Sequence, residues 1–385
     1  MIAALVPAIN PADNPLSAEF YRLLAQNLGP ALLPLLTGMA VTVALVLPAR
    51  WLSFRVGAVS HPGGRNIHTQ PTGRLGGIAL AAGFLVSALL YATRQPGSRT
   101  VVTTVVAAGI AVILAYTYDD LRPMRARTQL AVSAAVAVAV VAMGVSIQNV
   151  GLGRGAPIHL GILAIPISIF WLMGMQNTMN LMDGVDGLAA GVAAIVAAAL
   201  LLAAVNRLGD HPEGRTVIVL SAALVGACVG FLFFNFHPAR IFMGAGAHFL
   251  GVTLGIISIL GVAKGAVVFA LVVPVMALLI PIVDTAWAII RRRRQLVSIG
   301  HPDNEHIHHQ LLDFGLSQRQ TCLVFYFGTG ITASLGLMLF GHRKILGVAV
   351  VLLVVALSTL LGERLNEIEV GQGAEGSPTT ALLES

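Results

Sequence analysis

Residues 188–205 read Leu-Ala-Ala-Gly-Val-Ala-Ala-Ile-Val-Ala-Ala-Ala-Leu-Leu-Leu-Ala-Ala-Val, an apolar run without one charged or hydrogen-bonding side chain. As an α-helix it would rise about 27 Å, close to the thickness of a bilayer core of about 30 Å. A backbone in lipid finds no water to bond, and this run lacks the alternation of a barrel strand. The stretch therefore predicts a transmembrane helix.

Ten more apolar runs of similar character recur along the 385 residues, of which 56% are hydrophobic and 10% charged. This composition excludes an ordinary soluble domain. We predict an all-α, polytopic membrane protein of about eleven transmembrane helices, with a single domain at 31–362, an N-terminal segment at 1–30 and a polar, disordered tail at 363–385. The other runs are 31–48, 77–92, 101–118, 130–147, 158–175, 216–234, 249–262, 266–290, 321–340 and 345–361.

Positive charge is unequal between the two sets of alternating loops. The loops that include 50–75, 119–129 and 291–320 belong to the set with 14 of the 23 Lys and Arg residues, and four consecutive arginines, 291–294, directly follow a span. By the positive-inside rule this set is cytoplasmic, with the N-terminus outside and the C-terminus inside. The basic residues form no single stripe, so the net charge of +6 does not indicate nucleic-acid binding.

Most unusual polar residues fall in the same set of loops. Asp119 and Asp120 end a span, and adjacent carboxylates there either recruit a divalent cation or shift a pKa. A solvated helix end paired with the arginines at 122, 125 and 127 is an equally good interpretation.

The segment 177–191 is more specific, because it joins two apolar spans yet carries Asn177, Asn180, Asp183 and Asp186. Each amide or carboxylate pair is three residues apart and would share a face if that part is helical. The alternative is a simple Asp-Gly turn.

Two basic clusters are candidates for binding phosphate. His306, His308 and His309 form one, and we favour phosphate over zinc because no matching ligand pattern appears; histidines capping a loop remain the alternative. Arg65 and His68, with Arg74 further on, form a glycine-rich cluster at the entrance of a span, which is a weaker indication because many loops share its composition.

The order of these motifs resembles the WecA/MraY-like polyprenyl-phosphate N-acetylhexosamine-1-phosphate transferases, glycosyltransferase family 4. The segments 177–191 and 302–319 carry the most specific likeness, and His-Ile-His-His at 306–309 is more similar to the N-acetylglucosamine-1-phosphate transferases. The resemblance extends over about residues 30 to 362.

The resemblance implies transfer of a sugar 1-phosphate, GlcNAc-1-phosphate above all, from a UDP-sugar to polyprenyl (undecaprenyl) phosphate, with UMP released. It also implies Mg²⁺, with Mn²⁺ as an alternative, and a place in the bacterial inner membrane with the active site facing the cytoplasm. The product would initiate a cell-envelope polysaccharide such as lipopolysaccharide or teichoic acid, and a homodimer is left open.

The resemblance also assigns roles to individual residues. Asp119, Asp120 and Asp183 would be the catalytic residues. Asp119 and Asp120 would handle the lipid phosphate and its proton, and Asp119 would also be a metal ligand. Asn180 and Asp183 would lie beside Mg²⁺ and the diphosphate. The assignments to substrate binding are Arg65, His68, Arg74, Asn177, Asp186, Asn235, Phe242, His306, His308 and His309, with Asp186, Asn235 and Phe242 in a uridine pocket.

The sequence departs from the family pattern at several positions. Gln129 stands where the family has a lysine, and Ser60 and Asn66 stand where it has an acid and a lysine. The segment from Phe242 lacks the aspartate that the family has after Met-Gly, between Gly244 and Ala245. We therefore expect weak or absent transfer in this chain, and a catalytically impaired member is one alternative. A transporter using Asp284 is another, and a metallohydrolase using the histidines is a third.

Overall fold

The computed structural model describes residues 18–62, 70–150, 158–206, 214–262 and 315–338. In these residues the chain forms α1 (Ala18–Val56), α2 (Gly76–Tyr91), α3 (Arg99–Leu121), α4 (Ala126–Ala142), α5 (Ala164–Met182), α6 (Leu188–Asn206), α7 (Gly214–Asn235), α8 (Gly246–Val262) and α12 (Gln318–Met338). Two short 3-10 helices, η2 (Ala92–Arg94) and η3 (Gly161–Leu163), extend the ends of spans.

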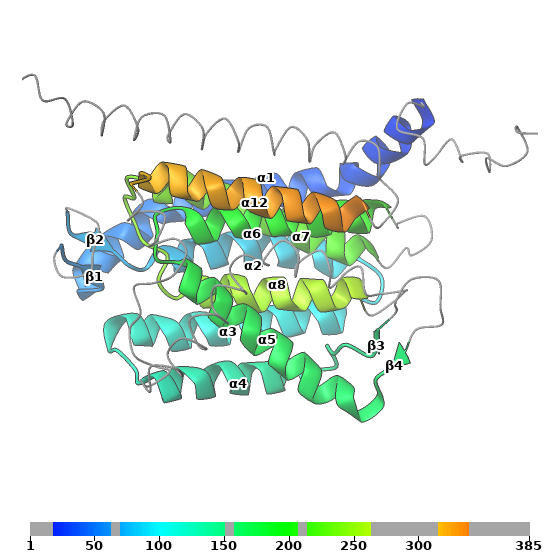
Figure 1. The fold of residues 1–385 in the computed structure, drawn as a ribbon, viewed down its shortest axis with the longest axis horizontal. Helices are drawn as coiled ribbons and strands as arrows, with labels where there is room; N and C mark the ends of the chain where they lie inside the picture. The colour runs from blue at the N-terminus through cyan, green and yellow to red at the C-terminus, as the bar shows by residue number, and fades with distance from the viewer. Residues whose placement is uncertain (1–17, 63–69, 151–157, 207–213, 263–314, 339–385) are drawn as a thin grey trace, which may run out of the picture.

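Two short antiparallel pairs mark opposite ends of the helical bundle. β1 (Val59–Ser60) pairs with β2 (Thr72–Gly73), and β3 (Asn149–Val150) pairs with β4 (Ile158–His159). Figure 1 shows the first pair at the left end of the long axis and the second at the right end, with the helices running between them. Both pairs lie outside the helical spans, so the prediction of an all-α membrane protein is confirmed.

Six of the described helices are long and apolar enough to cross a membrane. They are Leu28–Val56, Gly76–Arg94, Arg99–Leu121, Gly161–Met182, Leu188–Val205 and Gly214–Asn235. Helices α4 and α8 are apolar but shorter. Large apolar side chains such as Phe170, 79% exposed, and Leu114, 66% exposed, cover the outside of this bundle, as lipid rather than water requires. Of the predicted runs, 266–290 and 345–361 lie outside the described residues, so the total of eleven stays a prediction.

The predicted span 158–175 is displaced along the chain. Its first residues form β4 and η3, and the helix runs instead from Ala164 to Met182. Gly161 takes φ +53°, which interrupts a helix, and Pro166 fits because it falls in the first turn of α5. The polar segment after Met175 is therefore helical as far as Met182, and the turn begins at Asp183.

Glycines let three helices pack with their backbones in close contact. A Cβ on Gly226 of α7 would lie 1.9 Å from the carbonyl oxygen of Leu35 on α1, and one on Gly230 would lie 2.7 Å from that of Met39. On α2, a Cβ at Gly83 would lie 2.6 Å from the oxygen of Gly38. Small residues at helix contacts are the usual means of close association in lipid, and here they fix α1, α2 and α7 against one another.

We predict that Gly226→Ala destabilises the protein by about 1–3 kcal/mol, because the added methyl group meets backbone that cannot rotate away. The control is Gly174→Ala on α5, where a Cβ meets nothing within 4 Å. Thermal unfolding in detergent should show a lower melting temperature for the first variant only. Equal melting temperatures would contradict the close α1–α7 contact.

Candidate active site

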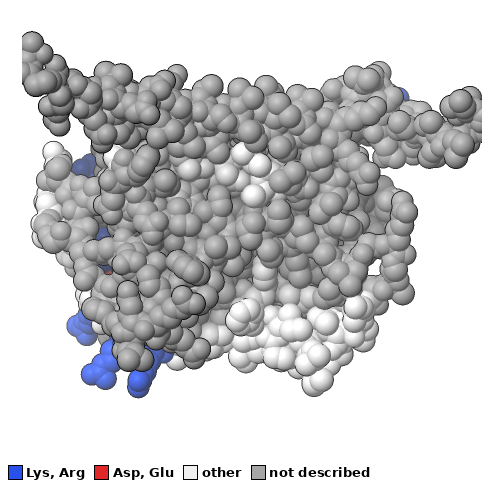
Figure 2. Space-filling view, in the orientation of Figure 1, with Lys and Arg blue, Asp and Glu red and all other residues white. Residues whose placement is uncertain are grey.

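The loops that carry the predicted polar residues meet at the β1–β2 end of the bundle. Backbone hydrogen bonds join β2 to the segment before α8, since Phe242 N donates to Gly73 O over 2.8 Å and Gly76 N donates to Phe242 O over 3.0 Å. Most Lys and Arg side chains visible in Figure 2 also lie toward this end. The structure thus brings together Arg74, Asp119, Asp120, Asp183, Asp186, Asn235 and Phe242. Arg65, His68, His306, His308 and His309 lie outside the described residues.

Asp119 and Asp120 are adjacent in sequence but have separate partners. Asp119 accepts hydrogen bonds from Met124 N and, over 2.8 Å, from Gln129 Nε2, which both belong to the turn into α4 and its first residues. Gln129, where the family pattern has a lysine, is therefore a neutral partner of Asp119. The Asp119 carboxylate is thus held by its own loop.

Asp120 reaches across the site to two other elements. Its Oδ1 lies 3.1 Å from Arg74 Nη2, and its Oδ2 accepts the Ala245 N–H over 2.8 Å. The carboxylate is 6% exposed while Arg74 is 43% exposed. Charge-assisted bonds of this kind are stronger than neutral ones, so Asp120 ties α3 to the starts of α2 and α8.

The segment where the family pattern has an additional aspartate is tightly closed. Gly244 has φ +54°, and a Cβ there would lie 2.3 Å from both Arg74 O and Asp120 Oδ2. A Cβ on Gly77 would lie 2.2 Å from Gly246 N, so the first turns of α2 and α8 touch. Only glycine fits these positions, and the Asp120 carboxylate lies directly against the shortened segment.

The Asn-Asp segment divides into a helical part and a turn. Asn177 Nδ2 donates to Met173 O one turn earlier over 2.8 Å, whereas Asn180 is exposed. Asp183 follows the last residue of α5, and its N–H donates to Asn180 O over 3.3 Å. The two asparagines share a helical face, and the two aspartates flank a non-helical turn.

Asp183 is the acid with the most unfavourable electrostatic surroundings. Burial raises the pKa of its carboxyl well above the usual range, the Asp120 carboxylate raises it further, Arg74 lowers it, and Asp186 raises it again. A bound divalent cation would reverse this balance. Among the described residues no three His, Cys, Asp or Glu side chains gather as a metal site, but Mg²⁺ takes only one or two protein carboxylates beside water and phosphate oxygens. Asp183 fits that requirement.

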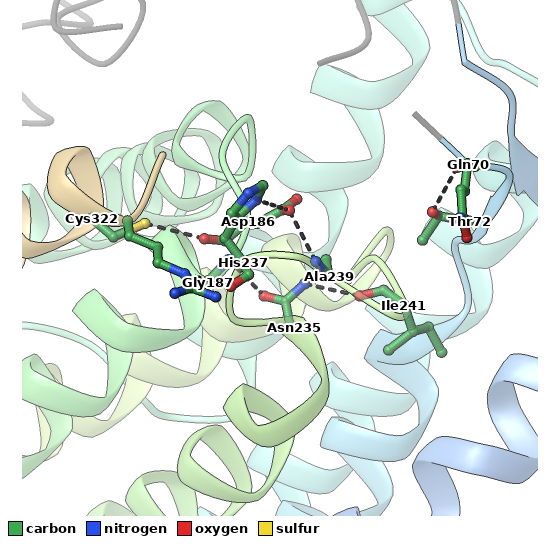
Figure 3. Close-up of polar contacts among 10 residues, drawn as sticks. Gln70, Thr72, Asp186, Gly187, Asn235, His237, Ala239, Ile241 and Cys322 are labelled. Carbon is green, nitrogen blue, oxygen red and sulfur yellow. Dashed lines mark hydrogen bonds and ion pairs between the residues drawn. The ribbon is translucent and has the colours of Figure 1, made fainter. Parts of the chain in front are cut away.

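Asp186 and Asn235 join two loops (Figure 3). Asp186 Oδ2 accepts hydrogen bonds from His237 Nδ1 over 2.9 Å and from Ala239 N over 3.0 Å. Asn235, only 2% exposed, accepts from Gly187 N over 3.1 Å and donates to Ile241 O over 2.9 Å. These bonds fix the turn after α5 against the segment between α7 and α8.

Helix α12 holds the same turn from the other side. Cys322 Sγ donates to Asp186 O over 3.1 Å, as Figure 3 shows, and Tyr326 Oη donates to Gly187 O over 2.6 Å. Arg319 Nε donates to His237 O over 3.0 Å. The sequence gives no sign of these three contacts, because the partners are far apart along the chain.

A second cluster missed by the sequence lies behind Asp119. The Tyr116 hydroxyl donates to Gln129 O over 2.9 Å and is 2.7 Å from Ser133 Oγ, while its ring stacks on His248 with centroids 3.5 Å apart. Tyr116 and His248 are 2% and 4% exposed. Tyr116 and His248 connect α3, α4 and α8. The Tyr116 hydroxyl also holds the backbone of Gln129, whose side chain donates to Asp119.

Comparison with known proteins matches residues 101–262 to the family model described as glycosyl transferase family 4. The chain is 35% identical over 295 residues to a Bacillus subtilis (strain 168) protein named "Probable undecaprenyl-phosphate N-acetylglucosaminyl 1-phosphate transferase", covering 74% of this chain and 78% of that one. The chain belongs to glycosyl transferase family 4.

Other members of glycosyl transferase family 4 are similar to this chain to different extents. The decaprenyl-phosphate N-acetylglucosaminephosphotransferase of Mycolicibacterium smegmatis is 37% identical over 327 residues, covering 77% of this chain and 80% of that one. The phospho-N-acetylmuramoyl-pentapeptide-transferase of Clostridioides difficile is 35% identical over 185 residues, covering 46% of this chain and 52% of that one. The family predicted from the motifs is confirmed, and the matched residues 101–262 include the whole turn after α5 and the segment between α7 and α8.

We predict that Asp183→Asn raises the melting temperature at pH 8 without divalent cations. The raised pKa means that folding disfavours the charged carboxyl, so the wild type loses stability as pH rises through that pKa. The difference between variant and wild type should shrink toward acidic pH, where the carboxyl is protonated. A variant that melts below the wild type at pH 8 would contradict this environment for Asp183.

Proposed function

We propose that this protein transfers N-acetylglucosamine 1-phosphate from UDP-N-acetylglucosamine to a polyprenyl phosphate in the bacterial inner membrane. The observation that carries the proposal is the convergence of Arg74, Asp120, Asp183 and Asp186 at one end of the bundle, with Asp183 electrostatically coupled to the other three. The names of the Bacillus and Mycolicibacterium relatives specify this type of transfer. Family membership favours it over the transporter and metallohydrolase alternatives.

The proposed reaction exchanges one phosphoanhydride partner for another. An oxygen of the lipid phosphate attacks the sugar-bearing phosphorus of the UDP-sugar and forms a new P–O bond. The bond from that phosphorus to the bridging oxygen breaks, its electron pair stays on that oxygen, and UMP leaves. The product is a lipid-linked diphosphate sugar, so both phosphates carry negative charge that the site must neutralise.

Different described residues would bind the metal ion, supply positive charge and orient the loops of the site. Asp183, with the exposed amide of Asn180 one turn earlier, would hold Mg²⁺. When bound, Mg²⁺ supplies positive charge to the diphosphate oxygens. Arg74, partly exposed and paired with Asp120, supplies a fixed cation at the same end. Asp119 has both oxygens engaged by Met124 and Gln129, which favours orientation of the α3–α4 turn over metal binding.

A catalytically impaired member is the second candidate, and the closed segment at Gly244 favours it. The Asp120 carboxylate already accepts the Ala245 N–H, and Gly244 has no space for a side chain. In this conformation the segment contributes no carboxylate of its own to a cation.

We predict that inserting Asp between Gly244 and Ala245 raises Mg²⁺-dependent UMP release by about tenfold or more, since a metal ligand contributes several kcal/mol of transition-state stabilisation. The assay contains UDP-N-acetylglucosamine and polyprenyl phosphate, with Asp183→Asn added to each version as the inactive control. Efficient transfer by the present sequence and a loss on insertion would contradict the role of the absent residue. UMP release by neither version would contradict the proposed function.

The proposed orientation places the β1–β2 end in the cytoplasm. It rests on the charge bias of the loops, and the basic turn at Arg122 and Arg125 lies at this end, after α3. Thr100, exposed in the first turn of α3, lies at the opposite end of the same span.

Cysteine labelling tests this orientation with little background, because Cys228 and Cys322 are both buried. We predict that a membrane-impermeant maleimide applied to intact cells labels Thr100→Cys and leaves Arg125→Cys unlabelled until the membrane is permeabilised. Labelling of Arg125→Cys alone in intact cells would reverse the topology.

A further inference from the structure

His237 is a partly exposed imidazole at the site that neither the motifs nor the family resemblance assigns a role. Its side chain is 36% exposed, and its Nδ1 lies 2.9 Å from Asp186 Oδ2. Because a carboxylate only accepts hydrogen bonds, Nδ1 carries the hydrogen of this bond. Among the described residues Nε2 makes no hydrogen bond, so Nε2 is the ring nitrogen available to a ligand. It donates to a phosphate oxygen when the ring carries a hydrogen on both nitrogens, as an imidazolium.

Asp186 holds this ring in one orientation. The same Oδ2 that accepts from His237 also accepts the Ala239 N–H, and the Asp186 carbonyl accepts the Cys322 S–H. The carboxylate is 13% exposed against 36% for the imidazole. A carboxylate that fixes the tautomer and direction of a histidine is the usual support for a histidine that contacts a ligand.

A cation from α12 is bonded to the backbone of His237. Arg319 is exposed and donates its Nε to the carbonyl oxygen of His237, which leaves its two terminal amino groups for other acceptors. Guanidinium groups bind phosphate through paired hydrogen bonds. Arg319 is bonded to His237, and His237 is bonded to Asp186 in the turn that begins with Asp183, so both groups belong to the end of the bundle where Asp183 lies.

We propose that His237 Nε2 and the Arg319 guanidinium contact a phosphate group of a substrate, and that Asp186 is the positioning residue for His237. This inference rests on the proposed function, because that function supplies two phosphate ligands, the nucleotide sugar and the polyprenyl phosphate. In this proposal Asp186 acts through the His237 imidazole, whereas the resemblance implies a place in the uridine pocket.

The test measures dissociation constants of the full-length protein in detergent for UDP, UMP, uridine and a short-chain polyprenyl phosphate. His237→Asn keeps a donor at the place of Nδ1 for Asp186 and removes Nε2. Arg319→Met removes the guanidinium from an exposed position. The control is His159→Asn, which alters an exposed histidine whose Nδ1 is 2.8 Å from Asn149 Oδ1 at the opposite end of the bundle.

We expect both site variants to bind one phosphate ligand about tenfold more weakly, as for a lost hydrogen bond to a charged group, with uridine binding and the His159 variant unchanged. Weaker UMP and UDP binding assigns the contact to the nucleotide, and weaker lipid phosphate binding assigns it to the acceptor. Wild-type affinity for all phosphate ligands in both variants overturns the inference alone. A wild type that binds neither nucleotide nor lipid phosphate overturns the inference and the proposed function together. If His237→Asn does not fold, Arg319→Met decides by the same criteria.

Discussion

The Asp120 carboxylate is the interaction on which the arrangement of the site depends. It bonds Arg74 at the start of α2 and the Ala245 N–H at the start of α8, while its own residue belongs to the last turn of α3. A nearly buried carboxylate is costly unless charged or polar donors surround it. The need of this buried carboxylate for donors therefore brings the ends of α2, α3 and α8 together. The contact of Gly77 with Gly246 at the same place is possible only because neither residue has a side chain.

The second half of the site is organised around Asp186 in a similar way. Its carboxylate and the adjacent backbone accept bonds from His237, Cys322 and Tyr326, which come from two different parts of the chain. A side chain on Gly191 would block this approach, because its Cβ would lie 2.0 Å from the Tyr326 ring. Helix α12 can thus approach the turn closely and hold it, although α12 follows the turn by more than a hundred residues.

The sequence predicts the parts of this protein that follow from local chemistry. Long apolar runs predict the helices, and the loop pattern predicts that Asp119, Asp120, Asp183 and Asp186 lie on one face of the membrane, while the resemblance assigns them to one site. The predicted start at residue 158 differs from the observed start of α5 at Ala164, because apolarity alone does not distinguish Ile158 in a strand from the same residue in a span. Contacts such as Tyr326 with Gly187 depend on how distant helices pack, which no local pattern encodes.

The segment between Phe242 and α8 is where the sequence departs from the family pattern that the resemblance gives. The resemblance indicates that a carboxylate is missing there, and the structure shows that the resulting segment closes on Asp120 rather than leaving a gap. One oxygen of Asp120 is engaged in the backbone bond from Ala245. Asp183 is the acid whose charged form a cation would stabilise most, since burial and two neighbouring carboxylates raise its pKa. The turn after α5 therefore holds the acid that best fits the proposed cation site, and α12 and the α7–α8 segment hold this turn through Asp186 and Gly187.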